Sequence, residues 1–158
     1  MGGQRLTATW AGPRPDGRPV VATGVFDVLH IGHVRFLREA AARGFPLVVG
    51  VEDDDRVRAW KGPGRPVNPA AERAEVLSAL RSVAGVFVIS GPPEVSKWAD
   101  YSELLASLEP VALAYTAGDP HTEAKRLGAE AMGAQAWEFG LTEAHSTSAM
   151  LEAITSLG

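Results

Sequence analysis

Apolar and polar positions follow two alternating patterns from Pro19 to the end of the chain. Short continuous apolar runs indicate buried strands, whereas apolar residues at three- and four-residue spacing indicate helices with one buried face. The predicted strands are Val20–Thr23, Leu47–Val51, Val86–Ile89, Val111–Tyr115 and Gln135–Phe139. The predicted helices are Ile31–Arg43, Pro69–Ser82, Tyr101–Leu108, Glu123–Met132 and Thr147–Leu157. This alternation predicts an α/β fold, a Rossmann-like three-layer sandwich with a central parallel five-stranded sheet.

The first eighteen residues show neither pattern. They include the stretch 12–18, in which glycine, proline and arginine alternate and break regular structure. We therefore expect residues 1–18 to form a loosely ordered extension that can still cover part of a site, and residues 19–158 to form one domain.

The composition narrows the classes of function. With 158 residues, of which 46% are hydrophobic, the chain is large enough to bury a core. It contains no cysteine and no apolar run of membrane-spanning length, which excludes disulfide scaffolds, thiol catalysis and membrane insertion, so we expect a cytoplasmic protein. A net charge of −4 with scattered basic residues argues against nucleic-acid binding. An anionic ligand must therefore be held by a local site.

The first predicted strand runs directly into the segment 24–33, Gly-Val-Phe-Asp-Val-Leu-His-Ile-Gly-His. Ligands of parallel α/β sheets bind beyond the carboxyl ends of the strands, so this loop is in the right place for a site. Gly24 allows a tight turn that presents backbone amides to an anion, and the following helix adds its free N–H groups. His30 and His33 are expected on one face of that helix, where both can touch one phosphate. Gly32 removes a side chain where a ribose or base would approach.

A protonated imidazole is disfavoured beside a helix N-terminus, whereas a bound triphosphate favours it. We therefore expect proton uptake at His30 or His33 when a triphosphate binds. Two alternatives stay open from the residues alone. One histidine can cap the helix while the other packs, or the pair can ligate zinc. No third zinc ligand is nearby in sequence, and His121 and His145 are poor evidence alone.

Taken together, Gly24, Phe26-Asp27, His30 and Gly32-His33 resemble the GxFDxxHxGH signature of the cytidylyltransferase-like nucleotidyltransferases. The resemblance covers about residues 19–158 and is closest to the adenylyltransferase domain of the ADP-heptose synthases and to glycerol-phosphate cytidylyltransferases. It implies transfer of a nucleoside monophosphate to an acceptor phosphate, with His30, His33 and Lys61 stabilising charge. It also implies Mg²⁺ carried by the triphosphate, with Asp27 as a weak candidate for contact through water.

The resemblance implies a larger set of nucleotide-binding residues. They are Thr23, Gly24, Val25, Phe26, Asp27, Gly32, Arg73, Gly118, Asp119, Ser146, Thr147 and Ser148. Chemistry alone leaves other roles open for some of them. Arg73 can form a surface ion pair on its helix, and the three hydroxyl residues 146–148 can simply cap the last helix.

The acceptor side is less defined. Lys61 lies in a Gly/Pro-rich stretch over 60–69, where a lysine is otherwise a solvated loop residue. Arg65, Trp98 and Tyr101 are weak candidates for acceptor binding, with packing as the alternative for the two aromatic residues. The run 53–55 of three aspartates is interpreted as a helix start or a solvated segment rather than a metal site. The stretch 115–119 lacks the lysine that heptose adenylyltransferases tend to carry there, so a different acceptor is expected.

These observations favour transfer of CMP from CTP to a small phosphate or phosphonate, with release of pyrophosphate. Transfer of AMP from ATP to a sugar phosphate is the alternative within the class. A nucleotide-binding sensor without catalysis is the alternative outside it. We expect a homodimer and no nucleic-acid or membrane partner.

Overall fold

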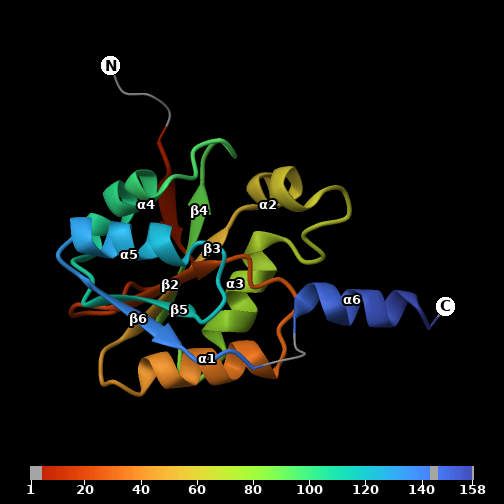
Figure 1. Cartoon of the computed structure of the whole chain (residues 1–158), viewed down its shortest axis with the longest axis horizontal. Helices are drawn as coiled ribbons and strands as arrows, with labels where there is room; N and C mark the ends of the chain where they lie inside the picture. Colours follow the sequence, from red (N-terminus) through yellow and green to blue (C-terminus); the bar gives the residue numbers. More distant parts are fainter. Residues whose placement is uncertain (1–4, 143–145, 158) are drawn as a thin grey trace.

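The structure, a computed structural model, describes residues 5–142 and 146–157 (Figure 1). Its described part contains one six-stranded sheet in the order β1-β4-β3-β2-β5-β6. The strands are β1 (Thr7–Trp10), β2 (Val20–Gly24), β3 (Leu47–Glu52), β4 (Gly85–Ser90), β5 (Ala112–Thr116) and β6 (Gln135–Phe139). Strands β2 to β6 are parallel, which confirms the predicted five-stranded parallel sheet, and β1 adds an antiparallel edge strand to β4.

The edge strand β1 corrects the interpretation of the first eighteen residues as a loosely ordered extension. Thr7 pairs with Ser90 and Trp10 with Phe87, and the side chain of Leu6 is buried. Further along, Arg18 Nε donates a hydrogen bond to the carbonyl of Glu109 at 2.9 Å. The segment from residue 5 onward is therefore fastened to the domain, while residues 1–4 lie outside the described residues. A four-residue strand is too short to show a hydrophobic period in the sequence.

Helices cover both faces of the sheet, as the alternating pattern predicts (Figure 1). Helices α1 (Ile31–Ala41) and α3 (Ala70–Ser78) pack on one face, where they bury Leu37 and Leu77. Helices α4 (Trp98–Leu105) and α5 (Thr122–Ala131), with the short 3-10 helix η1 (Ala106–Leu108), pack on the other. Side chains alternate along β2, so Val20 belongs to the first core and Val21 to the second. None of the described helices is long and apolar enough to cross a membrane.

No helix range was predicted over α2 (Asp54–Lys61), although a helix start was one of the two interpretations of the run 53–55. Asp53 caps it, since its side-chain oxygen accepts from Arg56 N at 2.9 Å, and Asp54 and Asp55 lie in its first turn. The helix-start interpretation of the three aspartates is therefore confirmed. Lys61 is the last residue of this helix rather than a loop residue. The helix has eight residues and a polar composition, so it gives little hydrophobic signal.

The order of the strands reverses at β2, because β3 and β4 lie to one side of it and β5 and β6 to the other. The carboxyl ends of β2 and β5 diverge there into separate connections, which is where open α/β sheets form their ligand crevice. The last helix, α6 (Thr147–Thr155), buries none of its residues and projects beyond the sheet (Figure 1). Its start lies beside the loop after β2, where Thr147 Oγ1 donates to the carbonyl of Val28 at 2.7 Å.

Candidate functional site

The two histidines of the motif build the N-terminus of α1 together. His30 is the N-cap, and its Nδ1 accepts from the backbone N–H of Gly32 at 3.0 Å. The Nδ1 of His33 accepts in turn from the backbone N–H of His30 at 3.2 Å. The two rings lie with their centroids 4.0 Å apart. The pair therefore caps the helix and stands side by side, so capping and ligand binding are not exclusive roles.

This capping fixes the tautomer of both rings. A neutral imidazole whose Nδ1 accepts a hydrogen bond carries its proton on Nε2. Protonation would add an N–H at Nδ1, directly facing a backbone N–H. Burial, and secondly the charge of His30, lower the pKa of His33 from 6.5 to about 4. The geometry therefore opposes proton uptake at His33, one of the two positions where the sequence led us to expect it, and supplies a neutral donor there.

The glycines of the motif make room for these side chains. A Cβ on Gly32 would lie 2.8 Å from Cε1 of His30, so the ring of His30 occupies the space that we had expected a ribose or base to use. A Cβ on Gly24 would lie 3.1 Å from Cε2 of Phe26. Phe26 has a left-handed backbone (φ 48°), which is uncommon for a residue other than glycine, and this bends the chain so that its ring covers Gly24. The tight turn after β2 is thus made at Phe26 rather than at Gly24.

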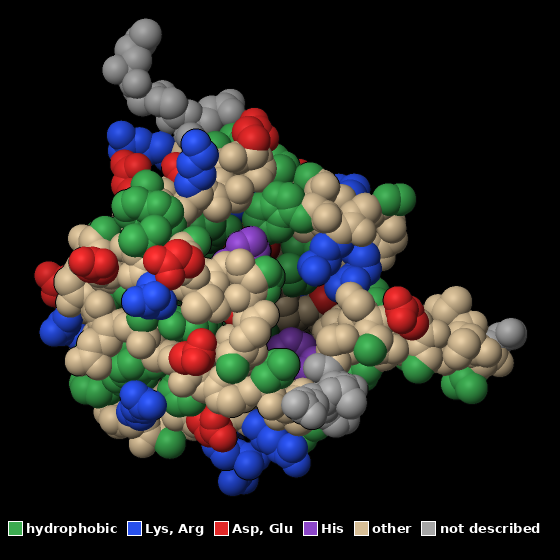
Figure 2. Space-filling model, viewed as in Figure 1, with side chains coloured by type: hydrophobic (Ala, Val, Ile, Leu, Met, Phe, Trp, Pro, Cys, Tyr) green, Lys and Arg blue, Asp and Glu red, His purple; other side chains and the backbone are tan. Residues whose placement is uncertain are grey.

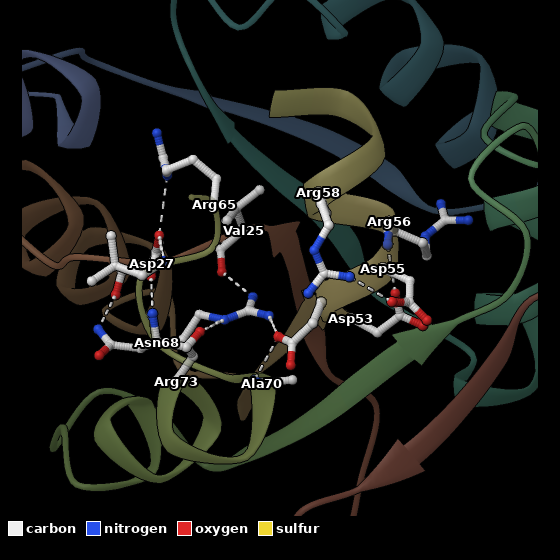
Figure 3. A network of polar contacts seen from close by, with 12 residues as sticks. Val25, Asp27, Asp53, Asp55, Arg56, Arg58, Arg65, Asn68, Ala70 and Arg73 are labelled. Atoms are coloured by element: carbon white, nitrogen blue, oxygen red, sulfur yellow. Dashed lines mark hydrogen bonds and ion pairs between the residues drawn. The ribbon is translucent and has the colours of Figure 1, made fainter. Parts of the chain in front are cut away.

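Asp27 holds the loop that follows α2, as Figure 3 shows. Its Oδ2 accepts from Val67 N at 2.7 Å and from Arg65 Nε at 3.2 Å, and its Oδ1 accepts from Asn68 N at 2.9 Å. Both oxygens of this buried carboxylate are therefore committed to the loop. Asp27 and Arg65 therefore clamp the loop 62–69 to the motif, whereas contact of Asp27 with a metal through water and of Arg65 with the acceptor stay predictions.

Arg73 is buried and joins three segments (Figure 3). Its guanidinium donates to the carbonyl of Val25 at 2.8 Å, to the carbonyl of Asn68 at 2.9 Å and to Asp54 Oδ1 at 2.8 Å. Arg73 is therefore neither a surface ion pair nor an available nucleotide ligand. It fixes the motif loop, the loop 62–69 and the start of α2 relative to one another.

The hydroxyl residues 146–148 have different roles. Ser146 caps α6 by accepting from Ala149 N at 3.0 Å, Thr147 fastens the helix to the motif loop, and Ser148 is exposed. Thr142 approaches Gly32 on the same side. The N-terminus of α6 thus lies beside the motif loop, on the side of Gly32 in α1. His145, considered above for zinc, lies outside the described residues.

A cavity of about 560 Å³ opens beside the end of β2. Figure 2 shows a hollow in this face, with histidine side chains at its edge and basic side chains on the α2 side. Of the residues predicted for the site, those lining the cavity are Thr23, Gly24, Val25, Lys61, Trp98, Tyr101 and Asp119. Its volume suits a small organic ligand. His30, His33, Gly118 and the hydroxyl residues of α6 lie outside its lining.

A buried polar cluster forms one wall of the cavity. Glu52, the last residue of β3, accepts from the hydroxyl of Tyr101 at 2.6 Å and from Arg56 Nε at 2.7 Å. Arg56 also donates to the carbonyls of Pro92 and Val95 at 2.7 and 3.0 Å. Burial raises the pKa of Glu52, against the opposing effect of its bonds to Tyr101 and Arg56. Tyr101 therefore both lines the cavity and fastens α4 to β3.

The turn after β5 places an ion pair on another wall. Gly118 has a left-handed backbone (φ 83°), and Asp119 follows it. Asp119 Oδ2 lies 2.6 Å from Lys125 Nζ, and its Oδ1 accepts from His121 N at 2.7 Å. Both oxygens of Asp119 are thus engaged within the protein, which argues against direct nucleotide binding by its carboxylate. The cavity is also lined by Glu52, Trp60 and Lys125, which were not predicted from the sequence because none lies in a recognisable motif.

Comparison with known proteins gives a consistent family. A sequence model described as cytidylyltransferase-like matches residues 21–115. Bifunctional protein HldE of Methylococcus capsulatus is 35% identical over 152 residues, covering 89% of this chain and 29% of that protein. HldE of Pseudomonas fluorescens is 39% identical over 138 residues, covering 85% and 27%. In fold, the chain is similar to a lipopolysaccharide core biosynthesis protein of Thermoplasma volcanium, with a TM-score of 0.61, 23% identity, and coverage of 81% and 98%.

A strand, a capped helix start and a second helix N-terminus at the switch point of a parallel sheet define a nucleotide-binding α/β domain. With the family match over residues 21–115, the chain belongs to the cytidylyltransferase-like family of nucleotidyltransferases. The resemblance drawn from the motif is confirmed. The chain spans less than a third of the length of the HldE proteins it matches.

Proposed function

We propose that this chain transfers AMP from ATP to a phosphate oxygen of a sugar phosphate. The acceptor oxygen bonds to the α-phosphorus, the bond from that phosphorus to the bridging oxygen breaks, and pyrophosphate leaves. The HldE relatives and the resemblance of the motif to an adenylyltransferase domain support ATP over the CTP that the sequence analysis favoured. Transfer of CMP from CTP is therefore the second candidate, and the assay below compares the two directly.

One arrangement carries the proposal: the histidine pair and the cavity meet at the end of β2. The capped start of α1 and the N-terminus of α6 offer donors for the triphosphate. The cavity on the other side offers space for the acceptor. In-line phosphoryl chemistry needs its attacking and leaving oxygens on opposite sides of the phosphorus, and a two-sided site supplies this.

The proposed roles follow from the geometry of each side chain. His33 is neutral and donates through Nε2 to a phosphate oxygen, which it can do while capping α1. His30 stands beside it and is assigned to the same triphosphate. Lys61 lines the cavity at the end of α2 and makes no ion pair with any other described residue. It compensates the charge that grows on the α-phosphate in the transition state.

Mg²⁺ is expected with the triphosphate, and the protein residues do not fit a magnesium site of their own. Asp27 is committed to Arg65, Val67 and Asn68. Within residues 5–142 and 146–157, no three His, Cys, Asp or Glu side chains are grouped to hold a metal. We therefore assign no step to a protein-bound ion.

Pyrophosphate release tests the proposal. The full chain is incubated with ATP or CTP, a panel of hexose 1-phosphates and Mg²⁺, and the rate is compared between the two nucleotides. We expect faster release with ATP. Faster release with CTP would establish the second candidate, and nucleotide binding without release in any combination would favour the sensor. The homodimer and the cytoplasmic location also stand as proposals.

A further inference from the structure

The cavity and the histidine pair lie on different faces of the sheet. The cavity lining includes Val21 and Leu105, which belong to the core under α4 and α5. The histidines stand at the start of α1, which packs on the opposite face. Gly24, the last residue of β2, lines the cavity, and the ring of Phe26 lies between Gly24 and His33, with its centroid 5.6 Å from that of His33. A triphosphate held by the α1 side therefore leaves the cavity to the other reactant.

Two lysines line this cavity from different elements, Lys61 at the end of α2 and Lys125 on α5. They differ in their surroundings. Lys125 is paired with Asp119 at 2.6 Å, and the two side chains are only 20% and 15% exposed. Lys61 is exposed and has no ion pair with the described residues. An ammonium group has three N–H donors, so Lys125 keeps two for a ligand while Asp119 accepts the third.

Asp119 holds Lys125 from a fixed position. Its backbone N–H donates to the carbonyl of Thr116 at 3.1 Å, which closes the turn after β5, and its Oδ1 accepts from His121 N. Burial alone would raise the pKa of Asp119, but the charge of Lys125 and these hydrogen bonds outweigh it and lower the pKa. Asp119 is therefore ionised at neutral pH, and its carboxylate fixes the Lys125 ammonium at the cavity wall.

The ion pair between Asp119 and Lys125 differs from an exposed ion pair formed by the neighbouring residue on α5. Arg126 pairs with Glu123 at 3.0 Å, and these side chains are 60% and 70% exposed. Such a pair contributes little to stability. Arg56, the buried cation near the cavity, is already committed to Glu52 and two backbone carbonyls. Lys125 is thus a partly buried cation with donors left over and a cavity in front of it.

We propose that this cavity is the acceptor site and that Lys125, positioned by Asp119, binds the phosphate group of the acceptor. The inference rests on the proposed nucleotidyl transfer and adds the residue that recognises the acceptor. Lys125 keeps its protons and donates hydrogen bonds to the non-attacking phosphate oxygens. The stretch 115–119 has no lysine of its own, and α5 supplies the cation from eight positions beyond Ala117.

Variants of neighbouring residues test the assignment in the pyrophosphate-release assay with glucose 1-phosphate as the acceptor probe. Lys125→Gln is expected to raise the KM for glucose 1-phosphate about tenfold or more, since a hydrogen bond between charged groups is lost. The KM for ATP should stay within about twofold. Arg126→Gln is the matched control and should change neither constant. An unchanged acceptor KM, or an equal rise in both constants, overturns the proposal.

Asp119 is proposed to act through Lys125, so its role is tested by comparing single and double substitutions of the two residues. Asp119→Asn should raise the acceptor KM and leave kcat within about twofold, and adding Lys125→Gln to it should cause little further rise, since coupled residues are not additive. Fully additive effects of the two substitutions would remove Asp119 from the positioning role.

A binding experiment separates failure of this inference from failure of the proposed function. Acetylation of the three lysines in the unsubstituted chain is followed by mass spectrometry with and without glucose 1-phosphate. Protection of Lys125 but not of the exposed Lys97 supports the acceptor site even if no nucleotide yields pyrophosphate. Equal modification of Lys125 in both samples overturns it, and the unsubstituted chain avoids any doubt about folding of a variant.

Discussion

The rings of His30 and His33 lie 4.0 Å apart, and the Nδ1 of His33 accepts from the backbone N–H of His30. Each histidine thus satisfies a helix-start amide with one nitrogen and holds its second nitrogen in a defined orientation. The helix cap and the candidate catalytic groups are therefore one structure. A change that disturbs the cap is expected to disturb the chemistry as well.

Two substitutions of His33 test the roles of its two ring nitrogens separately. Asn retains an acceptor near Nδ1 and loses the distal donor, whereas Gln retains a distal donor and loses the acceptor. If Nε2 stabilises the transition state, His33→Asn should lower kcat by roughly 100-fold while changing ATP affinity far less. His33→Gln should retain more kcat and lose more stability. Equal falls in kcat and affinity for His33→Asn would contradict the assignment.

Binding of ATP is expected to occur without proton uptake at His33 at pH 7. The pKa of His33 is about 4 in the free protein, and protonation at Nδ1 would face the N–H of His30. A bound anion raises this pKa, but uptake requires a rise of about three units, which corresponds to roughly 4 kcal/mol. Calorimetry in buffers with different ionisation enthalpies checks this. Enthalpies that vary with the buffer would show protonation.

Gly32→Ala should displace the ring of His30. The added Cβ would lie 2.8 Å from Cε1 and 2.9 Å from Nδ1 of that ring, so the cap on the amide of residue 32 would be lost. Loss of such a cap costs about 1 kcal/mol, and kcat should fall with it. The control is Gly140→Ala, because a Cβ there meets no atom within 4 Å. Unchanged kcat and Tm in Gly32→Ala would show that the ring is not held as described.

Asp27→Asn distinguishes an anchor from a metal contact. Both carboxylate oxygens accept from N–H donors, so an amide NH₂ would face Val67 N or Asn68 N. We expect a loss of about 1–3 kcal/mol in the free energy of unfolding. The Mg²⁺ concentration giving half-maximal activity should stay unchanged. A large rise in that concentration without destabilisation would restore the metal role.

Arg73→Lys should destabilise the protein although it keeps the charge. One ammonium cannot replace the donors that reach Val25, Asn68 and Asp54, so buried carbonyls lose their partners. The expected loss is roughly 2–4 kcal/mol in urea unfolding. Arg58→Lys, at an exposed pair with Asp55, is the control and should lie within about 0.5 kcal/mol of the unsubstituted chain. Similar values for the two variants would contradict the description of Arg73.

The parts of the fold that follow from local patterns were predictable. Five strands and the helices between them have clear apolar periods, and all five strands form the parallel sheet. Strand β1 and helix α2 were not, because four residues, or eight mostly polar ones, give too little periodic signal. The position of β1 depends on its pairing with β4, which lies far away in the sequence. The start of α2 is held by the bonds of Asp54 to Ala70 and Arg73.

By itself, the sequence determined the class of protein and the place of its chemistry. The two histidines and Gly32 form this helix start through contacts among residues 30–33, so a local motif describes them. Only the tertiary structure decided the roles of Asp27 and Arg73, which are charged residues whose partners lie up to 48 positions away. The tertiary structure also brought Lys125 to the cavity wall. A motif records spacing along a chain, whereas the pairing of a buried charge depends on which segments the fold brings together.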